Sequence, residues 1–273
     1  MRPCKKNIFT LALVSVFLVL LAACSSHDED PESQVKYLPS KIISEGEIST
    51  TTTTYDYDNI NRLVRVIKTE SYTQGDVMNE IVLDILYNDF NKISHVIKTT
   101  KVADLVLKAD TETRDTIGFR YSGNSVLTRN SIIDTDSGNR VTRHITFTEN
   151  PAYVISSKIY EYDYEGKLKA VTFEDEEAGY RNQSEYDYDS GNGIFGDVNT
   201  PQWFLATQLD EKLNLIGNNI QESLTETGKD PLVTTRTYNY NDDGYPVSES
   251  VYYSGYSLTV DVKPITIEYT IGR

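Results

Sequence analysis

A group of potential oxygen ligands lies near the C-terminus, where Asn239, Asn241 and Asp243 alternate and Gly244 follows. Oxygen-bearing side chains at alternate positions before a glycine are typical of the start of a calcium-binding loop. Such a loop places a bidentate Glu at its twelfth position, and here that residue is Ser250. We therefore interpret the segment as a tight hairpin turn, because Asn, Asp and Gly tolerate positive φ.

The sequence contains none of the common catalytic motifs. No Gly-x-Ser-x-Gly elbow, His-Glu-x-x-His helix or glycine-rich phosphate loop occurs, and His27, His95 and His144 are dispersed. A carboxylate pair for glycoside hydrolysis stays open as an alternative, because 41 acidic residues offer many pairs and none stands out. We expect no catalytic residue, no metal and no cofactor.

Cys24 has the clearest chemical role. Three basic residues and an apolar run over residues 8–23 precede it, which is the pattern of a secretory signal peptide. The run is shorter than the ~20 apolar residues of a membrane-spanning helix. The tetrapeptide Leu-Ala-Ala-Cys ending at Cys24 resembles a lipobox, which implies that residues 1–23 are removed and that Cys24 carries lipid. Acyl chains on this residue would anchor the protein in a membrane.

An acidic stretch begins just after the cysteine, within a tether that we assign to residues 24–36. It resembles the export signal of Bacteroidetes lipoproteins that are displayed on the cell surface. The resemblance implies an outer-membrane lipoprotein facing outward, with the periplasmic leaflet as the alternative. The residues of this signal are Ser25, Ser26, Asp28, Glu29 and Asp30.

The composition of the mature chain limits its partners. Removal of residues 1–23 leaves 23 basic and 41 acidic residues, a formal charge of −18. This charge argues against nucleic acid, whose phosphates need a basic surface. The only other cysteine, Cys4, lies in the signal peptide, so the mature chain cannot form an internal disulfide.

A recurring phrase dominates the mature sequence. It combines alternating aromatic residues, then Asn, Asp or Gly, then a basic and an apolar residue. The alternation places tyrosines on one face of a strand, and the polar residues supply a tight turn, so each phrase predicts one β-hairpin. Clear copies cover residues 54–63, 85–93, 160–168 and 238–246, and degenerate copies begin at residues 119 and 186.

These phrases resemble the tyrosine-aspartate (YD) repeats of bacterial surface proteins. Together with the lipobox, they resemble a Bacteroidetes lipoprotein family of unknown function with a porin-like β fold, over most of residues 45–273. The pattern departs at Gly123, Asn124 and Ser125, where the expected basic residue is missing. The resemblance implies a fold and a location but no activity.

One segment interrupts the hairpins. Thr200 and Pro201 fit the N-cap and first position of a helix, and Gly217 can end it. We predict a short helix near residues 200–213. It either plugs an open end or edge of the sheet, or presents Trp203 and Phe204 as a platform for a glycan or peptide ligand.

We predict one antiparallel all-β domain over residues 37–273, a meander of about 12–16 strands. We expect it to curl or to close like a barrel, because strongly twisted open sheets rarely exceed ~10 strands without curling or closing. A non-catalytic surface binding or adhesion module is our first functional hypothesis. A structural or assembly-partner lipoprotein is the second, and a glycan-active enzyme is the third. Exposed tyrosines would favour binding, packed tyrosines a structural role, and two facing acids in a cleft an enzyme.

Overall fold

The computed structural model describes residues 35–47, 49–72, 77–104, 109–148, 153–211, 215–226, 229–255 and 258–273. A compact unit runs from Lys36 to Arg273. Cys24 and the predicted export residues Ser25 to Asp30 lie outside the described residues.

The described residues form seventeen strands and one short helix, α2, so the strand count slightly exceeds the predicted range. The all-β antiparallel class is confirmed. The strands are β1 (Tyr37–Glu45), β2 (Ser49–Tyr57), β3 (Leu63–Tyr72), β4 (Val77–Tyr87), β5 (Ile93–Asp104), β6 (Ala109–Gly118), β7 (Arg120–Ser122), β8 (Ser125–Leu127), β9 (Ser131–Thr135), β10 (Val141–Phe147), β11 (Val154–Tyr162), β12 (Leu168–Asp175), β13 (Tyr180–Tyr188), β14 (Asn219–Glu226), β15 (Leu232–Tyr240), β16 (Pro246–Gly255) and β17 (Leu258–Ile271).

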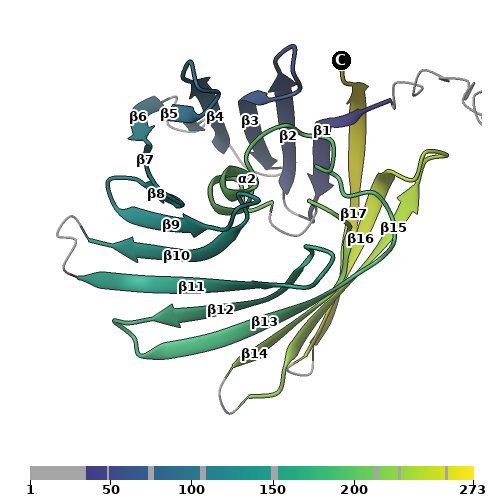
Figure 1. The fold of residues 1–273 in the computed structure, drawn as a ribbon. Coiled ribbons are helices and arrows are strands. Elements are labelled where there is room, and N and C mark those ends of the chain that lie inside the picture. The colour runs from purple at the N-terminus through teal and green to yellow at the C-terminus, as the bar shows by residue number, and fades with distance from the viewer. Residues whose placement is uncertain are drawn as a thin grey trace, which may run out of the picture. The chain divides into compact units, whose positions relative to one another are not determined.

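The strands curl into a nearly closed barrel around α2 (Figure 1). Strand β1 pairs antiparallel with both β2 and β17, which joins the two ends of the meander. Among the described residues, ladders join every pair of successive strands except β6 and β7. Only Phe119 separates β6 from β7, so the two follow each other along the chain, and the described structure gives β6 no ladder on the edge away from β5.

Five hairpin turns at one end of the barrel share one geometry. In the first, the Asp58 carboxylate accepts hydrogen bonds from the backbone N–H groups of Ile60 (3.1 Å) and Arg62 (2.9 Å). The fourth residue, Asn61, has a φ of 64°, which Asn tolerates better than most residues. The same bonds recur in the other turns, and we call the set the turn rim: residues 58–62, 88–92, 136–140, 163–167 and 241–245.

The strand tyrosines of the repeated phrase share one face, as predicted, and the structure turns that face inward. Tyr55, Tyr160 and Tyr186 are 5%, 6% and 7% exposed. A tyrosine near the rim end of a strand donates its hydroxyl hydrogen to a carbonyl on a nearby strand, and we call these bonds the tyrosine belt. They are Tyr57 to Pro39 (2.8 Å), Tyr87 to Leu63 (3.0 Å), Tyr121 to Ile93 (2.9 Å), Tyr238 to Asn219 (2.9 Å) and Tyr269 to Pro246 (2.9 Å).

The basic residue of the phrase also has a structural role. The Arg62 guanidinium lies 4.1 Å from the ring centroid of Tyr87, on the next hairpin. Lys92 covers Tyr121 in the same way at 4.8 Å. Each such cation–π contact links one hairpin to the next.

Helix α2 (Gln202–Gln208) fills the barrel beneath the turn rim. It is shorter than the predicted 200–213, and Pro201, not Thr200, is its N-cap. The Thr200 hydroxyl instead accepts the backbone N–H of Leu63 at 2.8 Å, a tertiary bond that holds the helix to β3. The helix ends at Leu209 because Asp210 turns to a φ of 60°, well before Gly217.

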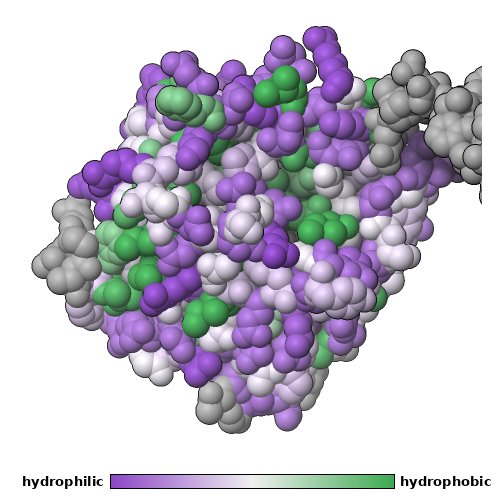
Figure 2. Space-filling model, in the orientation of Figure 1, coloured by the Kyte–Doolittle hydropathy of each residue, from purple (hydrophilic) through white to green (hydrophobic). Residues whose placement is uncertain are grey.

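The outer face of the barrel carries charged side chains. Leu83 and Ile85 pack in or against the core, so Asp84 between them faces outward. The face seen in Figure 2 is mainly hydrophilic, with apolar residues in separate patches. In the part of the chain described, no helix is long and apolar enough to span a membrane. Cross-strand ion pairs on the outer face are Arg65–Asp84 (3.5 Å), Lys101–Glu80 (2.9 Å) and Arg181–Glu174 (3.5 Å).

Candidate functional site

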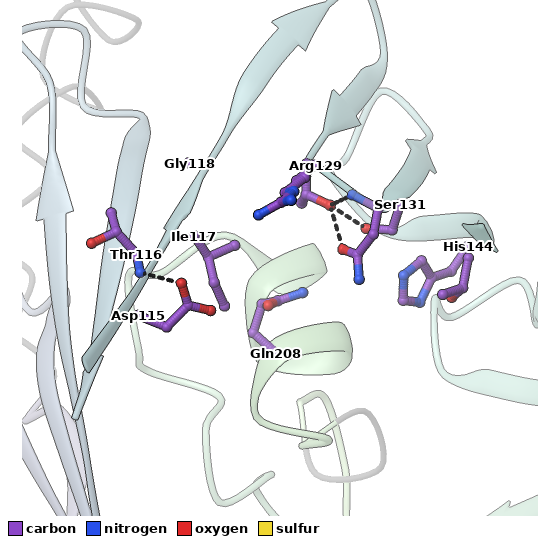
Figure 3. A pocket seen from close by; sticks show the side chains of 11 residues that line it. Asp115, Thr116, Ile117, Gly118, Arg129, Ser131, His144 and Gln208 are labelled. Carbon is purple, nitrogen blue, oxygen red and sulfur yellow. Dashed lines mark hydrogen bonds between the residues drawn. The ribbon is translucent and has the colours of Figure 1, made fainter. Parts of the chain in front are cut away.

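Beside the edge of β6 that faces away from β5 lies a cavity of about 520 Å³, which we call the seam pocket (Figure 3). It lies between β6 on one side and the β8–β9 turn with β10 on the other. Gln208 of α2 lies between the two sides. The lining residues are Asp115, Thr116, Ile117, Gly118, Thr128, Arg129, Asn130, Ser131, His144, Thr146 and Gln208.

The seam forms because the chain leaves β6 abruptly. Phe119 turns into the core, where its ring centroid lies 5.2 Å from that of Trp203. Its backbone N–H donates to the Ser94 carbonyl at 2.9 Å, after the last pair of the β5–β6 ladder. The next strand, β7, pairs only with β8 in the described structure. One edge of β6 thus remains without a described partner strand.

The sequence of β6 suits an exposed edge. Residues 111–116 are polar or charged and all are exposed in the structure. Charged side chains on an edge strand discourage pairing with other chains. The Asp115 carboxylate accepts the backbone N–H of Thr116 at 2.8 Å, and Ile117 supplies an aliphatic surface to the pocket.

A small hydroxyl network shapes the opposite side. The hydroxyls of Thr128 and Ser131 lie 2.8 Å apart, and both residues are buried. The Thr128 hydroxyl also accepts the Asn130 backbone N–H at 3.2 Å. This network holds the turn in place while the exposed side chains of Arg129 and Asn130 line the pocket.

His144 and Gln208 supply the deeper polar groups. Burial, together with the nearby Lys158, lowers the pKa of His144 from 6.5 to about 4. The imidazole is therefore neutral at physiological pH, and it offers one donor and one acceptor. The Gln208 amide donates to the Thr207 hydroxyl at 3.2 Å and faces the pocket from the helix.

The seam pocket presents polar groups of several kinds. Its hydroxyl, amide, imidazole and guanidinium groups are spread over both sides and the helix. Asp115 is an exposed carboxylate bonded to its neighbouring backbone. Among the described residues, no group of three or more His, Cys, Asp or Glu side chains could hold a metal ion.

The predicted ligand platform on the helix is wrong for this structure. Trp203 is 2% exposed and Phe204 is 0% exposed. Both rings pack against Phe119, at centroid distances of 5.2 and 6.3 Å. The alternative interpretation of the helix as a plug describes what is observed.

Buried Glu249 and half-buried Glu222 meet at Arg236 but do not form an acid pair in an open cleft. The guanidinium of Arg236 lies 3.5 Å from Glu222 and 3.3 Å from Glu249. Burial raises the pKa of Glu249, and Arg236 opposes that rise. Because one arginine holds both carboxylates, this cluster supports the wall rather than a hydrolytic pair.

The predicted calcium-like segment is a hairpin turn. The Asn241 side-chain oxygen accepts the backbone N–H groups of Asp243 (3.1 Å) and Tyr245 (2.9 Å). The oxygen is thereby engaged within its own turn. Of the three dispersed histidines, His144 lines the seam pocket.

A scan against protein-family models finds no match, and a search of curated protein sequences finds none either. Two crystal structures resemble the fold. A porin-like protein from Bacteroides uniformis ATCC 8492 is 15% identical, with a TM-score of 0.45, and the match covers 79% of this chain and 98% of that chain. A porin-like protein from Bacteroides vulgatus ATCC 8482 is 13% identical, with a TM-score of 0.43, and the match covers 86% of this chain and 99% of that chain. These likenesses concern the fold alone.

Proposed function

We propose that this protein is a non-catalytic, lipid-anchored protein of the cell envelope that binds a small polar ligand in the seam pocket. The observation that carries the proposal is the edge of β6 without a ladder in the described structure, beside which a polar cavity reaches the helix. Elsewhere the tyrosine face is packed, so binding belongs to the seam and not to the tyrosines.

The proposed location rests on the N-terminal sequence. Cys24 follows a signal-peptide pattern and precedes an acidic stretch, which favours an outer-membrane lipoprotein facing the cell exterior. The periplasmic leaflet is the alternative. Ion pairs such as Lys101–Glu80 interrupt the apolar band that a membrane-spanning barrel needs. We therefore expect the barrel to stand outside the bilayer, tethered by its lipid.

A short glycan suits the seam pocket best. Sugar hydroxyls both donate and accept hydrogen bonds, and the side chains of Asn130, His144 and Gln208 can do the same. Ile117 and the threonine methyl groups offer apolar surface to the C–H faces of a sugar ring. A ligand pocket with a few placed polar groups in an apolar lining is the usual pattern for small molecules.

An extended peptide is the second candidate. The free edge of β6 favours it, because a peptide can add to an unpaired strand through backbone hydrogen bonds. Such a peptide would run along residues 110–118 and place a side chain in the seam pocket.

The test uses the mature chain with Cys24→Ser on arrays of oligosaccharides and short peptides, followed by calorimetric titration of the strongest binder. We expect Gln208→Leu and Asn130→Ala each to weaken glycan binding about five-fold, for the loss of about 1 kcal/mol of hydrogen bonding. Gln183→Leu, an amide on the outer face of β13, is the matched control and should bind normally. Absence of any binder, or a binder that ignores both seam variants, would reject the proposed site.

Lipidation is tested separately. Mass spectrometry of the mature protein from its native membrane should find acyl groups on an N-terminal Cys24. The Cys24→Ser protein should leave the membrane and stay in solution without detergent. A native protein with an intact signal peptide, or a Cys24→Ser body that needs detergent, would contradict the anchor.

A further inference from the structure

The turn rim carries exposed apolar side chains at its tips. Phe90 is 83% exposed and Tyr164 is 95% exposed, which is unusual for large aromatic residues. Tyr164 directly follows Asp163, and Phe90 lies two residues after Asn88. Both therefore stand at the tips of their turns, pointing away from the barrel. Three further side chains at the same end are exposed: Ile60 (43%), Ile216 (41%) and Ile271 (69%).

The chain enters the barrel at this same end. Strand β1 begins at Tyr37, and the backbone N–H of Gly272 donates to the Lys36 carbonyl at 2.8 Å. Ile271 is paired with Tyr37 in the β1–β17 ladder. Lys36 lies twelve positions after Cys24, so the chain between them can span at most about 40 Å. A lipid on Cys24 therefore keeps this end of the barrel within reach of the membrane.

The acidic side chains beside the exposed tips are mostly paired. Asp58 lies 2.6 Å from Arg62, and Glu165 lies 3.3 Å from Lys167. The turns at residues 58–62 and 88–92 each have one acid and one base, the turn at 163–167 has one excess acid, and the turn at 241–245, which contributes none of these apolar tips, has two. Amphipathic aromatic rings are favoured at the membrane–water interface. The local negative charge beside the tips is therefore smaller than the net charge of the chain suggests, so electrostatic repulsion between the tips and a lipid surface is reduced.

We propose that the turn rim rests on the membrane that holds the Cys24 lipid, with Phe90 and Tyr164 in the interfacial layer. This inference rests on the proposed lipid anchor but not on the seam ligand. The opposite end of the barrel, with the β12–β13 turn at residues 176–179, then points away from the membrane.

The first experiment measures which end touches lipid. The mature chain is coupled through the Cys24 thiol to a maleimide lipid in phosphatidylcholine vesicles whose acyl chains are brominated, so natural acylation is not required. Phe90→Trp and Tyr164→Trp should be quenched by bromine, while Ala178→Trp at the opposite end should not. Trp203 is common to all variants and is 2% exposed. Equal quenching at both ends, quenching at residue 178 alone, or no quenching would overturn the proposal.

The second experiment measures affinity without the anchor. The Cys24→Ser mature chain is sedimented with phosphatidylcholine vesicles at increasing lipid concentration. Joint Phe90→Ser and Tyr164→Ser should lower vesicle binding about ten-fold or more, because two apolar rings are lost from the interface. Tyr252→Ser with Tyr253→Ser is the matched control, since those rings are 41% and 39% exposed on β16. Equal binding by both double variants would contradict the proposal. Failure of the proposed lipid anchor is distinguishable from failure of this inference, because it would appear only in mass spectrometry of the native protein, as a Cys24 without acyl groups.

Discussion

The turn rim and the seam are built from the same kind of hairpin but close the barrel in different ways. At the rim, an Asx residue, a tyrosine and a basic residue lock each hairpin to the next, as Asp58, Tyr87 and Arg62 do. At the seam, β6 has no ladder beyond β5 among the described residues, and the β8–β9 turn opposite it is held by Thr128 and Ser131. The missing basic residue after Gly123 does not explain the opening, because the rim turn at residues 241–245 also has none and β15 and β16 still pair.

The largest effect should come from the plug beneath the rim. Trp203→Ala removes a ring packed against Phe119 and Phe204 and should lower the free energy of unfolding by about 3–5 kcal/mol. Urea denaturation of the Cys24→Ser chain measures it. Tyr164→Ala, which removes an exposed ring, should change stability by less than about 0.5 kcal/mol. Equal losses would mean that the helix is not part of the core.

The next effect should come from the Asx side chain of a rim turn. Asp58→Ala leaves two backbone N–H groups and Arg62 without their acceptor and should cost about 1–2 kcal/mol. Asp58→Asn should cost less, because Asn88 makes the same backbone bonds in its own turn. Urea denaturation of the two variants measures both losses. If Asp58→Asn lowers the free energy of unfolding as much as Asp58→Ala does, the turns do not share one geometry.

The same aspartate should respond to acid. Burial opposes ionisation of Asp58, but hydrogen bonds from Arg62 and Ile60 outweigh it and hold the pKa of the carboxyl below 3.8. Its contribution to stability is therefore present above pH 3.8 and lost as the pH falls through the lower folded value. Asp58→Asn should show a smaller loss of stability between pH 5 and pH 3. If stability falls with pH equally steeply in Asp58→Asn and in the parent protein, the ionised Asp58 carboxylate does not stabilise the turn.

A smaller effect is expected from a single bond of the tyrosine belt. Tyr87→Phe keeps the ring under Arg62 but removes the hydrogen bond to the Leu63 carbonyl. We expect a loss of about 0.5–1.5 kcal/mol in urea denaturation. A double-mutant cycle with Arg62→Gln separates the hydroxyl bond from the cation–π contact. If Tyr87→Phe leaves the free energy of unfolding unchanged, the hydroxyl bonds of the tyrosine belt do not stabilise the barrel and only the packing of the rings does.

The smallest effect on stability should come from the protonation of His144 in the seam pocket. His144 has a folded pKa of about 4, below its ordinary 6.5, so the unfolded chain takes up a proton first as the pH falls. Stability is lost as the pH falls from about 6.5 toward 4, and at pH 6 the loss should be about 1 kcal/mol at most. His144→Gln should remove this loss between pH 7.5 and pH 6, before the rim aspartates titrate. An identical slope in the variant would place the response elsewhere.

The hairpins and the placement of the tyrosines on one face of each strand could be predicted from the sequence, because turn chemistry and strand alternation are local. The limits of α2 could not, because Thr200 makes a tertiary bond to Leu63 instead of capping the helix. Burial of Trp203 also depends on the whole barrel, although the plug was one predicted alternative. The seam depends on how β6 meets the β8–β9 turn and β10, which is a matter of tertiary structure. Its one local signal is the polar and charged run at residues 110–116, which suits an exposed edge strand.

Hydrogen–deuterium exchange of the Cys24→Ser chain tests the central claim, that the barrel is sealed except at a ligand-binding seam. Edge strands with free backbone groups exchange faster than strands paired on both sides. Residues 111–117 of β6 should therefore exchange well before residues 80–86 of β4, which pair with both β3 and β5. A saturating ligand from the arrays should slow exchange at residues 111–117 and 128–131 alone. Protection of β6 in the free protein, or ligand protection confined to α2 or the turn rim, would contradict the account.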